Sequence, residues 1–408
     1  MRNSQRMVVA ALLAATAGAA SANGLGYALT HGTIDLSLRP RYEIVKQPGK
    51  KEAHAFTLRT LLGYETASYE HLRVLLQLIN VASFVNDYNS LLNHKTQYPV
   101  IPDAAATNVN QAYLSYSGLP ATTVRAGRQI IVLNNGRFVG NVDFRQNMQT
   151  FDAVSLANHS LRHLTLYAAY SWRIKDILNA LIPARVTLLN ASYLFAPKSV
   201  ASVYSYTYEN RAHTVIPGAA GCDVPGGPAV CNSETAGIRV AGQAPITPGL
   251  RILYDADYAH QSPAGGGSAL IHASYYHAGG GLGIGPAFVR VDEEAMGSNG
   301  AGTYGFQTPL ATKHLFNGWA EVFLVTPPTG LRSSYVTVGG KLLGTQLMAR
   351  YYRFQAYHTS ERYGHEWDLS AIYPFRPGLV AGVQYADYRA DHYAVNTRAA
   401  WVFVSYHY

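Results

Sequence analysis

The chain has 408 residues, of which 48% are hydrophobic and only 14% carry a charge. Soluble domains usually contain about 25% charged residues, so this composition disfavours an ordinary soluble protein. The 30 Tyr and 37 Gly suit a wall that faces lipid on one side and has aromatic girdles and tight turns. No apolar run after the N-terminus reaches the roughly 20 residues of a spanning helix, which excludes a helical inner-membrane protein.

The N-terminus has the features of a cleaved secretory signal peptide over residues 1–22. Arg2 and Arg6 precede a short apolar stretch, and Ala20-Ser21-Ala22 resembles a small-residue cleavage site. A single domain is then expected over residues 23–408. Without the two N-terminal arginines, 30 basic and 24 acidic residues are left, a net charge of +6. Export and the even spread of Lys and Arg disfavour a nucleic-acid partner, whereas a basic lumen would attract anions.

Two cysteines, Cys222 and Cys231, lie in the stretch GCDVPGGPAVC. Because an exported chain reaches an oxidising compartment, we expect a disulfide that closes a small loop. A metal site would need more ligands, and a catalytic thiol would need a nearby base, so both alternatives are weaker. No metal or cofactor is expected, and no catalytic residue is assigned.

Segments of about ten residues alternate apolar and polar side chains along the chain. In Thr33–Ile44 one face would carry Ile34, Leu36 and Leu38, and the other Asp35, Arg39, Arg41 and Glu43. These segments are longer than ordinary globular strands. Several apolar sets end in an aromatic residue, as expected at a lipid–water boundary: Tyr42, Tyr64, Tyr116, Tyr170 and Tyr388. The pattern predicts a transmembrane antiparallel β-barrel in the outer membrane of a Gram-negative-type envelope.

The strand tally gives nineteen candidates, and Glu234–Gly242 is the weakest of them. Because bacterial single-chain barrels have even strand numbers, we predict 18 strands, with 16 as the alternative. Longer connections, expected outside the cell, are predicted at Val81–Thr107, Asn134–Gln149, Ala212–Ser233 and Asp292–Thr312. The last strand, Thr397–Tyr408, ends in an aromatic residue, which resembles the signal read by the barrel-insertion machinery.

Arginines dominate the candidate pore residues. Those on polar faces of early strands, in the following strand and in the loop after it are Arg39, Arg41, Arg59, Arg73, Arg125, Arg128, Arg137 and Arg145, with Asp152 as a candidate partner. Arginine is always charged and pairs bidentately with carboxylates, so such a set could form an anion-selective constriction. The alternative is that Arg–acid pairs only neutralise buried lumen charge and brace the wall.

The stretch VRAGRQIIVLNNGRFVGNVDFRQNMQTFD, from Val124 to Asp152, resembles the alginate-export family of outer-membrane porins. Further matching pieces are DYNSLLNHKTQYPVIPD (Asp87–Asp103), GFQTPLAT (Gly305–Thr312), FNGWAEVFL (Phe316–Leu324) and QYADYRAD (Gln384–Asp391). Asp143-Phe144 replaces an expected Gly-Trp-like pair, and Tyr408 replaces a terminal Phe. The resemblance implies a monomeric barrel of about 18 strands with a charged pore, but it does not fix the cargo.

Three functions are therefore considered. The first is a passive porin for polar solutes, with a preference for anions. The second is a dedicated exopolysaccharide secretion channel, and the third is a barrel enzyme or adhesin. The enzyme is disfavoured because no G-x-S-x-G string is present and fold alone does not specify an activity.

Overall fold

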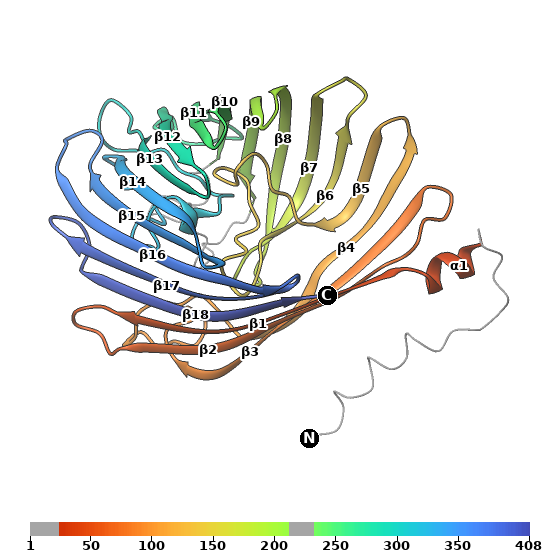
Figure 1. Cartoon of the computed structure of the whole chain (residues 1–408), viewed down its shortest axis with the longest axis horizontal. Helices are drawn as coiled ribbons and strands as arrows, with labels where there is room; N and C mark the ends of the chain where they lie inside the picture. The colour runs from red at the N-terminus through yellow and green to blue at the C-terminus, as the bar shows by residue number, and fades with distance from the viewer. Residues whose placement is uncertain (1–23, 212–231) are drawn as a thin grey trace.

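The computed structural model describes residues 24–211 and 232–408, so the predicted signal peptide and both cysteines lie outside the described residues. The described chain forms one antiparallel sheet of 18 strands. Strand β1 pairs with both β2 and β18, which closes the sheet into a barrel (Figure 1). The predicted fold class and strand number are confirmed.

A short helix, α1 (Leu25–Thr30), precedes the barrel, and no described helix is long and apolar enough to cross a membrane. The strands are β1 (Thr33–Lys46), β2 (Ala53–Glu65), β3 (Leu72–Asp87), β4 (Ala106–Leu119), β5 (Thr122–Gln129), β6 (Thr150–Asn158), β7 (Leu164–Lys175), β8 (Leu181–Ala196), β9 (Ser199–Asn210), β10 (Ser233–Thr247), β11 (Leu250–Pro263), β12 (Ala273–Ile284), β13 (Ala287–Met296), β14 (Leu331–Leu342), β15 (Thr345–Gln355), β16 (Arg362–Arg376), β17 (Leu379–Ala390) and β18 (Thr397–His407).

The two faces of the wall follow the alternation of the sequence. In β1 the side chains of Arg41 and Glu43 are only 3% and 2% exposed, whereas Ile34 is 58% exposed. Charged side chains thus point into the barrel and apolar side chains point out, which suits water inside and hydrocarbon outside. The prediction that Tyr388 belongs to the outer aromatic girdle is wrong. This residue is fully buried, and its hydroxyl donates a hydrogen bond to the Tyr363 carbonyl oxygen, 2.7 Å away.

Connections alternate between short and long. Turns such as 197–198 and 377–378 lie at the end of the barrel that carries the first and last strands' termini, and the long connections lie at the other end. Three predicted long connections have other bounds. Strand β3 continues to Asp87, so the first is 88–105, and β5 ends at Gln129, so the second is 130–149. Strand β13 continues to Met296 and β14 begins only at Leu331, so the third is 297–330. The weakest strand candidate is a full strand, β10.

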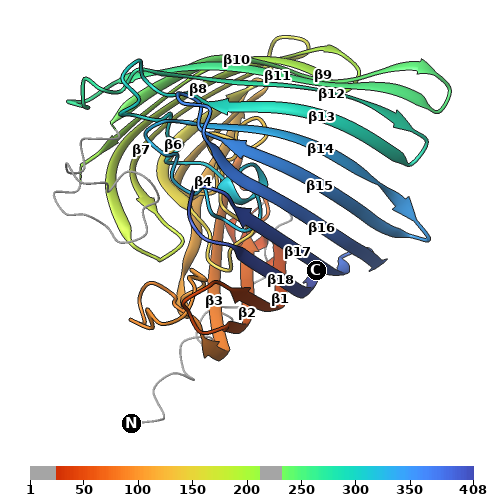
Figure 2. The same ribbon diagram turned by 90° about the vertical axis from the view of Figure 1, so that its left-hand side faces the viewer.

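The interior of the barrel is not empty. Strands β5 and β6 have only 8 and 9 residues, and the chain between them, 130–149, turns into the ring (Figure 1). Phe138 of this loop packs against Tyr275 of β12 and against Phe306 of loop 297–330, with ring centroids 5.0 and 5.8 Å apart. Two long loops therefore fold inward and pack on the inner wall, as Figure 2 also shows for the 297–330 side.

Candidate functional site

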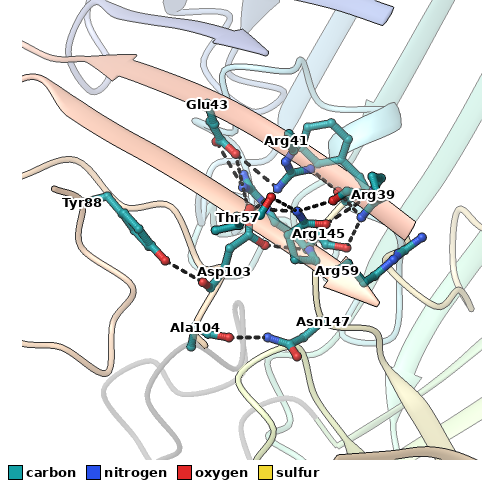
Figure 3. A network of polar contacts seen from close by, with 12 residues as sticks. Arg39, Arg41, Glu43, Thr57, Arg59, Tyr88, Asp103, Ala104, Arg145 and Asn147 are labelled. Atoms are coloured by element: carbon teal, nitrogen blue, oxygen red, sulfur yellow. Dashed lines mark hydrogen bonds and ion pairs between the residues drawn. The ribbon is translucent and has the colours of Figure 1, made fainter. Parts of the chain in front are cut away.

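Four arginines and four acids meet where loops 88–105, 130–149 and 297–330 contact the inner face of β1 and β2. We call this set the arginine–carboxylate cluster; it comprises Arg39, Arg41, Arg59, Arg145, Glu43, Asp103, Asp143 and Glu321. Figure 3 labels its four arginines together with Glu43 and Asp103. The odd-numbered residues of β1 and β2 point inward, so alternation alone delivers three of the arginines to one patch.

Asp103 lies at the centre of the cluster and is 1% exposed. One carboxylate oxygen pairs with Arg41 and lies 3.7 Å from the Nη1 atom of Arg145. The other oxygen accepts a hydrogen bond from the Gln146 backbone nitrogen at 2.7 Å. Burial opposes ionisation, but the guanidinium groups of Arg41 and Arg145 outweigh it and hold the pKa of Asp103 below its usual value.

Arg145 joins loop 130–149 to loop 297–330. Its Nη1 atom lies 3.2 Å from both carboxylate oxygens of Glu43, and its Nη2 atom pairs with Glu321. The neighbouring ring of Phe144 stacks on His314, with centroids 3.3 Å apart. Burial raises the pKa of Glu321, but Arg145 outweighs it and lowers that pKa to about 2.

Arg39 fastens the loop through its backbone. Its guanidinium donates to the carbonyl oxygens of Asp143, Phe144 and Arg145 at 2.8, 3.2 and 2.7 Å. Four positive and four negative side chains balance within the cluster, and most are nearly fully buried. A balanced buried network braces loops against a wall and contributes little net field to the lumen. For Arg41 and Arg145 the bracing interpretation is therefore favoured over direct contact with a solute.

A separate cavity of about 260 Å³ lies between loop residues and the inner wall of β11 to β15. Its lining combines aromatic and charged side chains: Asn135, Asp255, Tyr275, His277, Phe288, Arg290, Asp292, Glu294, Leu315, Phe316, Tyr335, Thr337, Met348 and Arg350. A concavity in which aromatic side chains and convergent polar groups meet is a candidate small-molecule site.

Arg350 is the notable cation of this cavity, because no described carboxylate forms an ion pair with it. Its Nε atom donates to Thr337 Oγ1 at 2.8 Å, and Nη1 donates to the Tyr352 hydroxyl at 2.8 Å. The guanidinium lies 5.2 Å from the Tyr335 ring centroid. No described residue accepts a hydrogen bond from Nη2, which leaves this donor for a molecule in the cavity.

The opposite wall of the cavity is already paired. His277 lies 3.1 Å from Asp292 and 3.8 Å from Asp255, and Arg290 lies 2.7 Å from Asp292. Glu294 accepts from Tyr275 at 2.7 Å and pairs with Arg137 at 2.6 Å. The acids of this wall are thus engaged by protein donors, which leaves Arg350 as the group best placed to bind an anion.

The structure separates the other predicted site residues from the cluster. Arg137 is fully buried against Glu294 and Asn317 and holds loop 130–149 in place. Arg73 is exposed at the start of β3, and Arg125 lies 5.1 Å from the ring centroid of Tyr113.

Arg128 and Asp152 do not line the lumen as expected. Strands β5 and β6 pair residue by residue without a bulge, and Arg128 lies three positions after the inward Arg125. Arg128 and Asp152 therefore share the outward face with Val154 and Leu156, which are 45% and 37% exposed. There Asp152 pairs with Arg128 at 2.7 Å and with Arg173 at 2.5 Å.

Sequence reasoning missed Arg350, Asp103 and Glu321. Arg350 lies on the same face of β15 as the inward Tyr352 and Phe354, because the three are two residues apart. The alternation of strand side chains could therefore have placed Arg350 in the lumen. Asp103 and Glu321 lie in irregular loops, where no periodicity indicates which side chains turn toward the wall.

No family model matches the chain, and no curated protein matches it in sequence. The structure is similar to OpdK of Pseudomonas aeruginosa, solved with vanillate, at 14% identity and a TM-score of 0.71, over 93% of this chain and 98% of OpdK. OpdL of the same organism matches at 17% identity and a TM-score of 0.67, over 93% of this chain and 99% of OpdL. OccAB2 of Acinetobacter baumannii matches at 14% identity and a TM-score of 0.68, over 93% of this chain and 98% of OccAB2.

The fold is that of the outer-membrane porins. Together with the apolar outward face, it confirms the predicted outer-membrane β-barrel. The finer resemblance to alginate exporters is not supported, because the similar structures are Opd and Occ proteins. At identities of 17% or less the likeness concerns the fold, and the cargo must be argued from the chemistry of the lumen.

Proposed function

We propose that this chain is a passive outer-membrane channel for small organic anions, and that Arg350 binds their carboxylate during passage. The main support is the guanidinium of Arg350, which lines the cavity of about 260 Å³. No described carboxylate forms an ion pair with it. The guanidinium of Arg350 is held by tyrosine rings and by the hydroxyls of Thr337 and Tyr352. Its cross-strand neighbour Asp368 forms no ion pair with it among the described residues, so an anion that enters gains a direct interaction with the free Nη2 donor.

The aromatic lining narrows the class of solute. The guanidinium shares its cavity with four aromatic rings, those of Tyr275, Phe288, Phe316 and Tyr335. Flat aromatic carboxylates would bury their ring there and present a planar anion to a planar guanidinium. The vanillate in the OpdK structure belongs to this class, which makes it a suitable probe. Two loops packed in the barrel favour small solutes over a polysaccharide chain.

The test compares uptake of vanillate with that of vanillyl alcohol, its uncharged analogue, into liposomes that hold the folded barrel. Wild type should admit vanillate faster than the alcohol, and Arg350→Gln should remove most of that difference while leaving the alcohol unchanged. Arg185→Gln serves as a control for arginine loss away from the cavity, because that side chain is 54% exposed on the outward face of β8. Equal rates for both solutes in wild type would contradict the proposal.

A further inference from the structure

Basic side chains also gather outside the lumen, on the outward face of β15, β16, β17, β18 and β1. Strand pairing aligns Arg353, His365 and Arg389 in one row across β15 to β17. Two residues further from the long-loop end, Arg398 pairs with Lys46 in register across β18 and β1. We call Arg353, Arg389, Arg398 and Lys46 the basic rim.

The rim lies at the ends of these strands that carry the long loops. Odd-numbered strands run toward that end, because both ends of the barrel sequence lie at the short-turn end. Arg353 and Arg389 are near the last residues of β15 and β17, and Arg398 is the second residue of β18. In a bacterial barrel with short periplasmic turns, this end faces the cell exterior.

Apolar residues continue the same outward face directly below the rim. Trp367 and Leu369 of β16 are 48% and 41% exposed, and Val383 and Val402 of the next strands are 49% and 55% exposed. Tyr351 pairs in register with Trp367, and their rings pack at a tilt with centroids 4.8 Å apart. The rim therefore sits where an apolar band with an aromatic border ends, which is the level of lipid headgroups.

Carboxylates of the protein neutralise only part of the positive charge of the basic rim. Asp387 lies 2.9 Å from Arg389 and 3.4 Å from Arg398, so two guanidinium groups share one carboxylate. Lys46 pairs with the exposed Glu52 at 2.8 Å, and no described acid pairs with Arg353. Four cations against two carboxylates leave an excess of two positive charges, and Lys46 and Arg398 are 56% and 50% exposed.

The opposite ends of the same strands have a different chemistry. Outward residues there include Tyr373 and Phe375 of β16 and Val404 of β18, which are 42%, 61% and 40% exposed. Arg376 is also exposed at that end, but its register partner is Leu379, so the row of aligned cations lies in one leaflet. The complementary partner is an anion attached to acyl chains that lie along the apolar band. Guanidinium groups in a row suit phosphate oxygens, which accept several charge-assisted hydrogen bonds.

We propose that the basic rim binds the phosphate groups of a phosphorylated lipid in the outer leaflet. The lipid's acyl chains would pack below on the face of Trp367 and Leu369, and its phosphates would contact Arg353, Arg389 and Arg398. This surface lies on the outside of the wall, so the proposal is independent of what passes through the lumen.

Native mass spectrometry of the folded barrel in detergent tests it, with bisphosphorylated lipid A as the probe. The variant Arg353→Gln/Arg389→Gln/Arg398→Gln should bind the lipid roughly a hundredfold more weakly, given the contribution of a basic residue near an anionic lipid surface. The control Lys198→Gln/Lys341→Gln/Arg376→Gln, which removes three exposed charges at the short-turn end, should bind as wild type does.

Two further probes separate the possible outcomes. Lipid A stripped of its phosphates should lose most of its affinity for wild type, and inorganic phosphate should compete only weakly. Unchanged binding by the rim variant, equal binding of the stripped lipid, or full competition by inorganic phosphate would each overturn the proposal. Heat-modifiable migration on a gel confirms that every variant is folded.

Discussion

Arg39 and Arg59 are direct cross-strand partners on the inner face of β1 and β2, and both reach the carboxylate of Asp143. The Nη1 atom of Arg59 lies 2.6 Å from Asp143 Oδ1, and that of Arg39 lies 3.9 Å from it. Like charges directly opposite on a sheet repel each other. The carboxylate from the inward loop offsets that repulsion, so two segments far apart in sequence depend on one another.

Replacing that carboxylate should alter the lumen charge more than the stability. Asp143 is 52% exposed, so Asp143→Asn should cost less than about 1 kcal/mol of unfolding free energy. It leaves two facing guanidinium groups uncompensated, and the reversal potential should shift toward anion preference. Asp87→Asn, at an acid 57% exposed at the end of β3, is the control and should shift nothing. A shift toward cation preference in Asp143→Asn would be inconsistent with this role.

Replacing Asp103, the buried acid at the centre of the same cluster, should instead lower the stability of the barrel. Asp103→Asn leaves Arg41 and Arg145 without their central carboxylate, and breaking a buried ion pair typically costs about 3–5 kcal/mol. Urea unfolding of the refolded barrel in detergent would measure this loss. Asp87→Asn again serves for comparison and should change the midpoint little. A loss below about 1 kcal/mol for Asp103→Asn would show that the cluster does not brace the loops.

The inward loop 297–330 should become less stable in mild acid. Burial lowers the pKa of His314 to about 4, against 6.5 for an ordinary histidine, although the carboxylate of Glu321 opposes the shift. Between these values the unfolded chain binds a proton that the folded chain does not, so stability falls as pH falls from 6.5 to 4. The loss is on the order of 3 kcal/mol at most.

Unfolding midpoints at pH 7.5 and pH 5 would measure this dependence. Wild type should be less stable at pH 5, whereas His314→Gln, which cannot take up the proton, should show a much smaller difference. Glu321 should not contribute in this range, because its pKa of about 2 and the usual value of 4.5 both lie below pH 5. The same pH difference in both proteins would rule out His314 as its source.

Loop 130–149 should limit ion flow through the barrel. Its residues pack on the inner wall through Phe138 and are fastened by Arg137 and Arg145, so they occupy lumen space. Replacing residues 138–148 by a short Gly-Ser linker should raise single-channel conductance in planar bilayers. Deleting Gly49 and Lys50, at the exposed tip between β1 and β2, should leave conductance unchanged. Unaltered conductance after the first change would mean that this loop does not form the constriction.

The wall of the barrel could be predicted from the sequence because lipid and water impose a period of two on every strand. That period assigned Arg39, Arg41 and Arg59 to the inner face, where the structure places them. The same period assigns Arg128 to the outer face, because it lies an odd number of positions after the inward Arg125. The prediction of a lumen position treats Arg128 as a strand-end residue, although the alternation still holds there up to Gln129.

The site could be predicted only in part, because loops carry no period. Nothing in the spacing of Asp103 or Glu321 indicates that they meet Arg41 and Arg145 across the lumen. The distinction between a paired arginine and an unpaired one is also a property of the folded molecule. Arg137 is neutralised by Glu294, whereas Arg350 meets rings and hydroxyls, and no local pattern separates the two.

The reversal potential in planar bilayers under a KCl gradient tests the central claim most directly. Wild type should prefer chloride over potassium, and Arg350→Gln should reduce that preference while the single-channel conductance stays close to that of wild type. A wild-type preference for potassium, or an Arg350→Gln channel with unchanged chloride selectivity, would contradict an anion channel that depends on the unpaired guanidinium of Arg350.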